Sequence, residues 1–90
     1  MKAIRATVHG AVQGVGFRYA ARSTAARLGV LGWVRNLPDG SVQVWAQGAA
    51  GAVDEFVAFL EHGSRGSVVR SVDLVDVDPD ATVVGFEITL

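Results

Sequence analysis

The alternation of apolar and polar residues divides the chain into five predicted strands and two predicted helices. Residues 2–9 alternate with the two-residue period of a half-buried strand. Residues 30–37 and 41–47 show the same strand character, and the Pro-Asp-Gly sequence at 38–40 supplies the residues of a tight turn. These two strands are therefore predicted to form a hairpin.

Two segments show the helical period instead. Apolar residues recur at helical spacing from 17 to 28 and from about 49 to 62. Gly29 and Gly63 stand where glycines commonly end helices. Each segment therefore predicts a helix of at least three turns.

The last third of the chain predicts two more strands. In residues 68–78 the apolar alternation shifts phase between Leu74 and Val75, which predicts a β-bulge there, because otherwise half of the apolar side chains would face water. A closing strand alternates cleanly at its apolar positions, Val84, Phe86, Ile88 and Leu90.

The order strand, helix, strand, strand, helix, strand, strand predicts an α+β fold. A hairpin between two helices is typical of the ferredoxin-like sandwich, a βαββαβ core with both helices on one face of an antiparallel sheet. The chain adds one C-terminal strand to this core. Its 90 residues are expected to form a single domain, residues 1–90.

Composition narrows the function classes. The formal net charge is −1, so no global field favours nucleic acid or an anionic membrane as a partner. The chain has no cysteine, which fits a reducing compartment. No apolar segment of a signal peptide follows Lys2, and no apolar run approaches the roughly eighteen residues of a membrane span. We expect a cytoplasmic protein that binds neither nucleic acid nor membrane.

The sequence between the first strand and the first helix points to an anion site. Gly10, Gly14 and Gly16 precede Arg18, and no side chain that commonly caps helices stands directly before Phe17. We expect a phosphate-binding site here, because free helix N–H groups, a glycine-rich loop that can curl and an arginine all favour an anion. The spacing alone leaves open a tight turn with an ordinary surface arginine, and it fits neither G-x-x-x-x-G-K-[ST] nor G-x-G-x-x-G.

Two long motifs resemble those of the acylphosphatases. Residues 8–18, VHGAVQGVGFR, are similar to the first signature of that family, and residues 32–48, which begin GWVRNLPDGSV, are similar to the second. The length, the element order and the sequence GFEI at 85–88 also agree with a small stand-alone acylphosphatase. The resemblance implies hydrolysis of acyl phosphates, the carboxylic–phosphoric anhydrides, to a carboxylate and inorganic phosphate.

The resemblance also implies a role for particular residues. Arg18 corresponds to the family's phosphate-binding arginine and Asn36 to its catalytic asparagine. The phosphate would also be held by the amides of the loop formed by Gln13, Gly14, Val15, Gly16, Phe17 and Arg18. The leaving carboxylate, whose conjugate acid has a pKa of about 4, needs no general acid. Asn36 would position the water, and the substrate phosphate would accept the proton.

The same resemblance implies no metal ion and no cofactor. The expected partners are a small-molecule acyl phosphate and inorganic phosphate, the latter as product and competitive inhibitor, and the expected state is a monomer. Other polar and aromatic residues are predicted to be structural or solvated, namely His9, His62, Trp33, Trp45, Arg22, Asp73, Asp76, Asp78 and Asp80. The segment 63–71, which contains Arg65, is the least similar to the family.

Three other functions compete with the enzyme. An RNA-recognition domain shares the fold but needs an aromatic signature in its third strand, which residues 41–47 lack. A module that senses phosphate or an acyl phosphate would use the same loop and Arg18 but would not need Asn36. A carbamoyl-phosphate-handling domain, of the kind found within hydrogenase-maturation proteins, shares both motifs. Turnover of a simple acyl phosphate distinguishes the sensing module from the enzyme.

Overall fold

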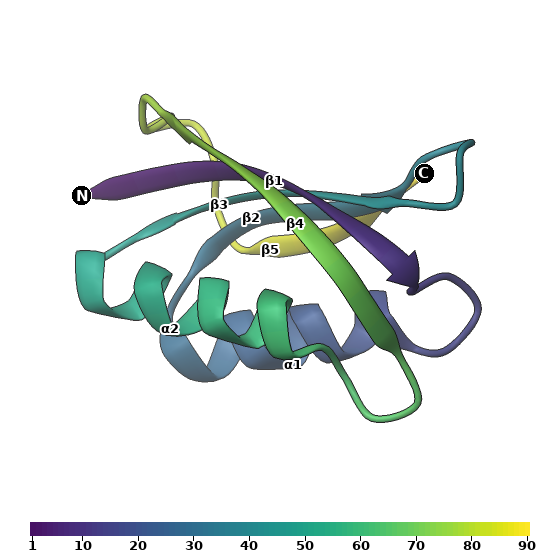
Figure 1. Cartoon of the computed structure of the whole chain (residues 1–90). Coiled ribbons are helices and arrows are strands. Elements are labelled where there is room, and N and C mark those ends of the chain that lie inside the picture. Colours follow the sequence, from purple (N-terminus) through teal and green to yellow (C-terminus); the bar gives the residue numbers. More distant parts are fainter.

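The computed structural model describes residues 1–90 and contains one five-stranded sheet with two helices packed on one of its faces (Figure 1). The predicted α+β sandwich is confirmed, and neither helix is long and apolar enough to cross a membrane. The elements in chain order are β1 (Lys2–Ala11), α1 (Phe17–Leu28), β2 (Leu31–Asn36), β3 (Val42–Gly48), α2 (Ala50–His62), β4 (Val68–Val77) and β5 (Phe86–Thr89).

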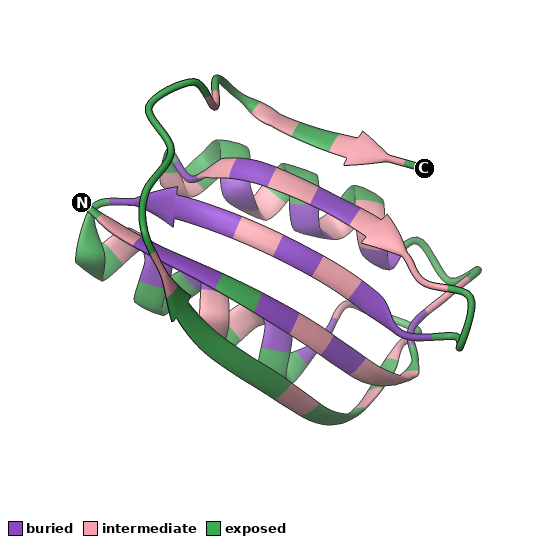
Figure 2. Cartoon of the chain, turned by 90° about the horizontal axis from the view of Figure 1, so that it is seen from above, coloured by how far each residue is buried: buried purple, intermediate pink, exposed green.

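The strands lie in the order β4-β1-β3-β2-β5. All neighbouring pairs are antiparallel except β2 and β5, which run parallel, so the sheet is mixed rather than wholly antiparallel. Because β4 and β5 occupy opposite edges, the chain between them has to cross the sheet. Figure 2 shows this connection passing over one end of the sheet.

The core lies between the sheet and the helices. Alternate residues of the three central strands point into it, including Ile4, Val34 and Val44, which are completely buried. Each such aliphatic side chain stabilises the fold by roughly 1.5–3 kcal/mol relative to exposure. The short Ala21 and Ala25 of α1 let this helix pack closely against α2 and the sheet. Aromatic contacts link both helices and β5 through Phe17, Phe56, Phe59 and Phe86.

The bulge in β4 is not where the sequence predicted it. The register with β1 runs without interruption from Ser71 to Val77 and shifts next to Gly10, so Arg70 is the extra residue. A Cβ on Gly10 would lie 2.1 Å from the carbonyl oxygen of Val68, which explains the glycine. Leu74 and Val75 point to opposite faces, and each is 48% exposed, because β4 is an edge strand that the helices cover only in part.

The closing strand is shorter than predicted. Only residues 86–89 pair with β2, and Phe86 and Ile88 pack against the core. Val84 and Leu90, which the alternation placed in the same strand, are exposed. The connection before β5 and the end of the chain therefore lie outside the sheet.

A buried glutamine fixes the connection between β4 and β5. Gln47 is 1% exposed, and its Nε2 donates a hydrogen bond to the carbonyl oxygen of Asp80 at 2.8 Å. Its Oε1 accepts a hydrogen bond from the Asp80 N–H, also at 2.8 Å. The side chain therefore satisfies both backbone groups of one loop residue and holds the loop against the sheet face opposite the helices.

Replacing this glutamine should destabilise the protein measurably. Gln47→Leu leaves the N–H and C=O of Asp80 without their partners, so we expect the free energy of unfolding to fall by about 1–3 kcal/mol. Urea denaturation followed by circular dichroism measures this. Gln43→Leu is the matched control, because Gln43 lies on the same strand and face but bonds only the partly exposed Arg35 side chain. An equal loss in both variants would contradict the assigned role of Gln47.

Candidate active site

The loop from Val12 to Gly16 connects β1 to α1 and depends on two left-handed glycines. Gly14 has φ 74° and Gly16 has φ 82°, a backbone region that residues with a side chain rarely adopt. A Cβ at either position would meet no atom within 4 Å, so the requirement is conformational and not steric. Gly10 serves a different purpose, the close approach of β4, so the three glycines do not act as one unit.

The start of α1 is left open toward this loop. Gly16 is the N-cap residue, no side chain caps the helix, and its first turn contains no acidic residue. The first backbone N–H groups of a helix have no partner within the helix and carry the positive end of its dipole. A cavity of about 230 Å³ lies here, lined by Val12, Gly14, Gly16, Phe17, Arg18 and Tyr19.

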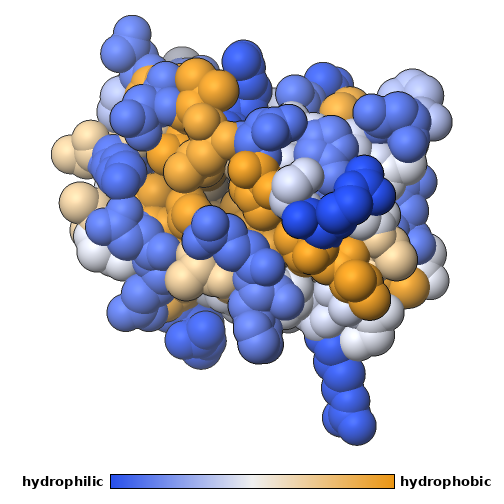
Figure 3. Space-filling model, viewed as in Figure 1, coloured by the Kyte–Doolittle hydropathy of each residue, from blue (hydrophilic) through white to orange (hydrophobic).

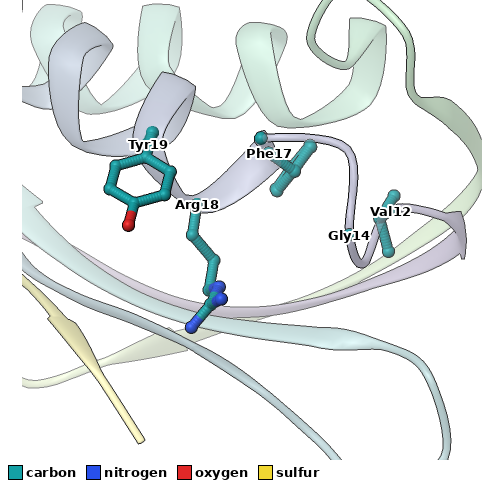
Figure 4. A pocket seen from close by; sticks show the side chains of 6 residues that line it. Val12, Gly14, Phe17, Arg18 and Tyr19 are labelled. Atoms are coloured by element: carbon teal, nitrogen blue, oxygen red, sulfur yellow. The ribbon is translucent and has the colours of Figure 1, made fainter.

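The side chain of Arg18 extends from the first turn of α1 toward the sheet (Figure 4). It is half-buried and forms no hydrogen bond or ion pair with the rest of the protein. All five guanidinium donors therefore remain free to bind an anion at the cavity. Tyr19 lies beside it in the same turn, with 60% of its surface exposed.

The Gln13 side chain joins the loop to the β2–β3 hairpin. Its Nε2 donates to the carbonyl oxygens of Leu37, at 2.8 Å, and of Ser41, at 2.9 Å. Ser41 in turn donates from its N–H and its hydroxyl to the Asp39 carboxylate, which closes the turn between the two strands. The glycine loop and the hairpin are thereby held together as one unit.

Asn36 is the last residue of β2 and directly precedes Leu37, which Gln13 binds. It pairs with Val42, a fully buried core residue, so its side chain lies on the helix-facing side of the sheet. Its Oδ1 atom is buried and has no hydrogen-bond partner. Buried acceptors without a partner are rare, and such an atom is suited to receive a hydrogen bond from a water or substrate.

The structure gathers most of the predicted site residues and separates others. Four of them line the cavity, namely Gly14, Gly16, Phe17 and Arg18. The Gln13 side chain turns to the hairpin, Val15 is 37% exposed, and Asn36 is not part of the cavity wall. Sequence reasoning missed Tyr19 as a lining residue, although its position next to Arg18 at a helix start is a usable signal.

The residues predicted to be structural lie elsewhere. The His9 Nε2 forms a hydrogen bond with the Asp73 carboxylate at 2.9 Å, on the sheet face opposite the helices. Trp33 and Trp45 pair across β2 and β3 on that same face, and Arg35 stacks over Trp33. No group of three His, Asp or Glu side chains is placed to hold a metal ion.

The chain is a small α+β sandwich with an uncapped helix start beside a cavity, and comparison with known proteins specifies its family. The acylphosphatase family pattern matches residues 4–88. An acylphosphatase of Rubrobacter xylanophilus is 46% identical over 87 residues, which are 97% of this chain and 79% of that protein. The crystal structure of the Bacillus subtilis acylphosphatase superposes with a TM-score of 0.95 at 34% identity, over 100% of both chains.

The fold also occurs inside a larger protein. Full-length HypF, in its phosphate- and nucleotide-bound form, superposes with a TM-score of 0.84 at 21% identity over 98% of this chain, but over only 12% of its own length. The chain described here belongs to the acylphosphatase family. Its activity is the hydrolysis of acyl phosphates, the reaction of a hydrolase acting on phosphorus-containing acid anhydrides.

The Gln13 bridge should be necessary for the stability of this end of the molecule. Gln13→Leu removes both donors from the Leu37 and Ser41 carbonyls, so we expect a loss of about 1–3 kcal/mol in the free energy of unfolding. Urea denaturation is the measurement. Gln13→Glu retains the length but cannot donate when ionised, and it should lose as much as Gln13→Leu. Wild-type stability in Gln13→Glu would show that the hydrogen bonds do not hold the loop.

The Asp39 turn predicts a dependence of stability on pH. Hydrogen bonds from the Ser41 hydroxyl and N–H hold the pKa of the Asp39 carboxyl below its ordinary value of 3.8. A carboxyl with a lowered folded-state pKa stabilises the protein above its unfolded-state pKa, and this contribution is lost as the pH falls through the folded-state value. The free energy of unfolding should therefore fall less between about pH 5 and pH 2 in Asp39→Asn than in wild type.

Urea denaturation across that range tests the pH prediction. Asp78→Asn is the control, because Asp78 is also exposed but accepts no hydrogen bond from a neighbouring side chain. Its pH profile should follow that of the wild type. Parallel profiles for Asp39→Asn and wild type would contradict the prediction.

Proposed function

We propose that Arg18 and the backbone N–H groups from Gln13 to Arg18 bind the phosphoryl group of the acyl phosphate. The observation that carries this proposal is the coincidence of an uncapped helix start and an unpaired arginine around one cavity. Both supply positive charge that no protein group neutralises. The guanidinium matches a phosphate with two parallel hydrogen bonds, which a lysine could not reproduce.

Asn36 positions the attacking water in this proposal. Its buried, unpartnered Oδ1 supports the role, since an amide oxygen can accept a proton of the water in a hydrogen bond but cannot remove it. Through the Gln13 bridge, the end of β2 is fixed relative to the loop that holds the phosphate. Positioning of this kind lowers the barrier without any proton transfer to the enzyme.

The reaction then needs few groups. The water oxygen bonds to phosphorus as the bond to the acyl oxygen breaks, and the carboxylate leaves with the bonding electrons. Arg18 and the loop N–H groups neutralise the charge on the phosphoryl oxygens in the transition state. The proton of the water passes to a phosphoryl oxygen of the substrate, because the cavity wall contains no carboxylate or histidine.

Membership of the acylphosphatase family supplies the remaining expectations. Inorganic phosphate, the product, should compete with substrate at Arg18, and no metal ion or cofactor takes part. The protein acts as a single domain and as a monomer. A module that only senses phosphate is the second candidate, because the loop and Arg18 would serve it equally well, but it leaves the unpartnered Asn36 oxygen without a role.

Hydrolysis of benzoyl phosphate by wild type, Arg18→Ala and Asn36→Ala, each with and without a chelator, tests the proposal. Wild type should turn over fast and regardless of chelator. Loss of the Arg18 guanidinium should lower kcat/KM by at least about a hundredfold, as expected for a preorganised charge contact. Asn36→Ala should lower kcat while inorganic phosphate still binds as an inhibitor. Arg27→Ala, at the far end of α1, is the matched control.

Several outcomes would contradict the proposal. Wild-type rates in Asn36→Ala would remove its assigned role, and phosphate binding without turnover by wild type would favour the sensing module. A break in the pH–rate profile near pH 7 that disappeared in His9→Gln would assign the proton to His9 instead of the substrate phosphate.

A further inference from the structure

Two side chains of α1 contact each other, namely Tyr19 at the cavity wall and the exposed Arg22. Tyr19 lines the cavity and is 60% exposed, and the Arg22 guanidinium lies over its ring at 5.3 Å from the centroid. Neither forms a hydrogen bond or an ion pair elsewhere in the protein. A positive charge is therefore held on an aromatic face at the edge of the candidate site.

This charge has no counter-ion on its own helix. Helix α1 contains three arginines, Arg18, Arg22 and Arg27, and no acidic residue, although the chain as a whole has a net charge of −1. Helix α2 carries acidic residues instead, including Asp54, which pairs with Lys2. Figure 3 shows the face that carries α2 and β4, where hydrophobic residues gather across the middle and hydrophilic residues surround them. Helix α1 therefore carries three positive charges and no negative charge.

The positions of Tyr19 and Arg22 on α1 place them close to Arg18 and the cavity. Arg18 and Arg22 are four residues apart, so they lie on the same side of the helix, about 6 Å apart along its axis. Arg18 and Tyr19 line the same cavity, so a phosphoryl group bound at Arg18 lies beside the Tyr19 side chain. Tyr19 is also 60% exposed, so its ring borders the cavity toward solvent. In Figure 4 the Tyr19 ring lies next to Arg18, on the same side of α1.

We propose that Tyr19 and Arg22 form a subsite for the acyl group that favours acyl phosphates carrying a second anionic group. The carbon skeleton of the acyl group packs against the Tyr19 ring. Arg22, kept over that ring, pairs with a carboxylate or phosphate about one helical turn away from the phosphoryl group. This inference rests on the proposed binding of the phosphoryl group at Arg18.

The test compares two substrates that differ in one charge. 4-Carboxybenzoyl phosphate carries a distal carboxylate, and 4-carbamoylbenzoyl phosphate carries a neutral amide of nearly the same shape. Wild type should hydrolyse the carboxylate with a kcat/KM roughly three- to fivefold higher, the size expected of one exposed ion pair. The difference should appear in KM and should shrink at high ionic strength.

Variants of α1 identify the residue responsible. Arg22→Gln should bring the ratio of the two kcat/KM values to about one, whereas Arg27→Gln, which removes an equal charge from the last turn, should leave the wild-type ratio. Tyr19→Leu should lower the ratio because Arg22 loses the ring that orients it. Tyr19→Phe keeps the ring and should retain the ratio.

The outcomes separate this subsite from the proposed function. Equal kcat/KM for both substrates in wild type, or equal losses in Arg22→Gln and Arg27→Gln, would overturn the subsite while benzoyl phosphate hydrolysis continues. Loss of the ratio in Tyr19→Phe would assign it to the phenol hydroxyl and contradict the stacking argument. Absence of benzoyl phosphate hydrolysis in wild type would instead overturn the proposed function itself.

Discussion

The two hydrogen bonds donated by the Gln13 side chain are the contacts on which the geometry of the site depends. Arg18 follows the glycine loop, whereas Asn36 ends a strand of the hairpin, so the two residues belong to different motifs and are 18 positions apart in the chain. Gln13 bonds the carbonyls of Leu37 and Ser41 and thereby fixes one motif relative to the other. The proposed mechanism depends on such fixed distances, because in it the water and the phosphoryl group have to meet in line.

The candidate site is positively charged although the protein as a whole is not basic. The net charge is −1, yet the cavity combines a helix start with no capping side chain and an arginine with no acidic partner. Proteins commonly satisfy such groups with a cap or an ion pair, and in the proposed function the substrate phosphate takes that place. The local field therefore arises from groups left unpaired, which is how the proposed site would attract a dianion in a domain with a net charge near zero.

A small sheet also has to protect its open face and edges. The helices cover one face only, and β4 is half exposed along one edge. The connection between β4 and β5 crosses one end of the uncovered face, where the buried Gln47 satisfies both backbone groups of Asp80. The charged Arg35 side chain lies over another part of that face. It donates a hydrogen bond to Gln43 and stacks on the Trp33 ring.

The sequence by itself determined the elements with a strong period and a clear terminus. Residues 17–28 form the predicted helix because Phe17, Ala21 and Ala25 share one face and the left-handed Gly29 ends it. The two motifs also determined the family. The tertiary structure decided the position of β5 and the true place of the bulge at Arg70, because both depend on strand pairing between distant segments. It likewise decided the neighbours of Gln13, Gln47 and Tyr19, since a side chain's partners across the fold leave no periodic signal in the sequence.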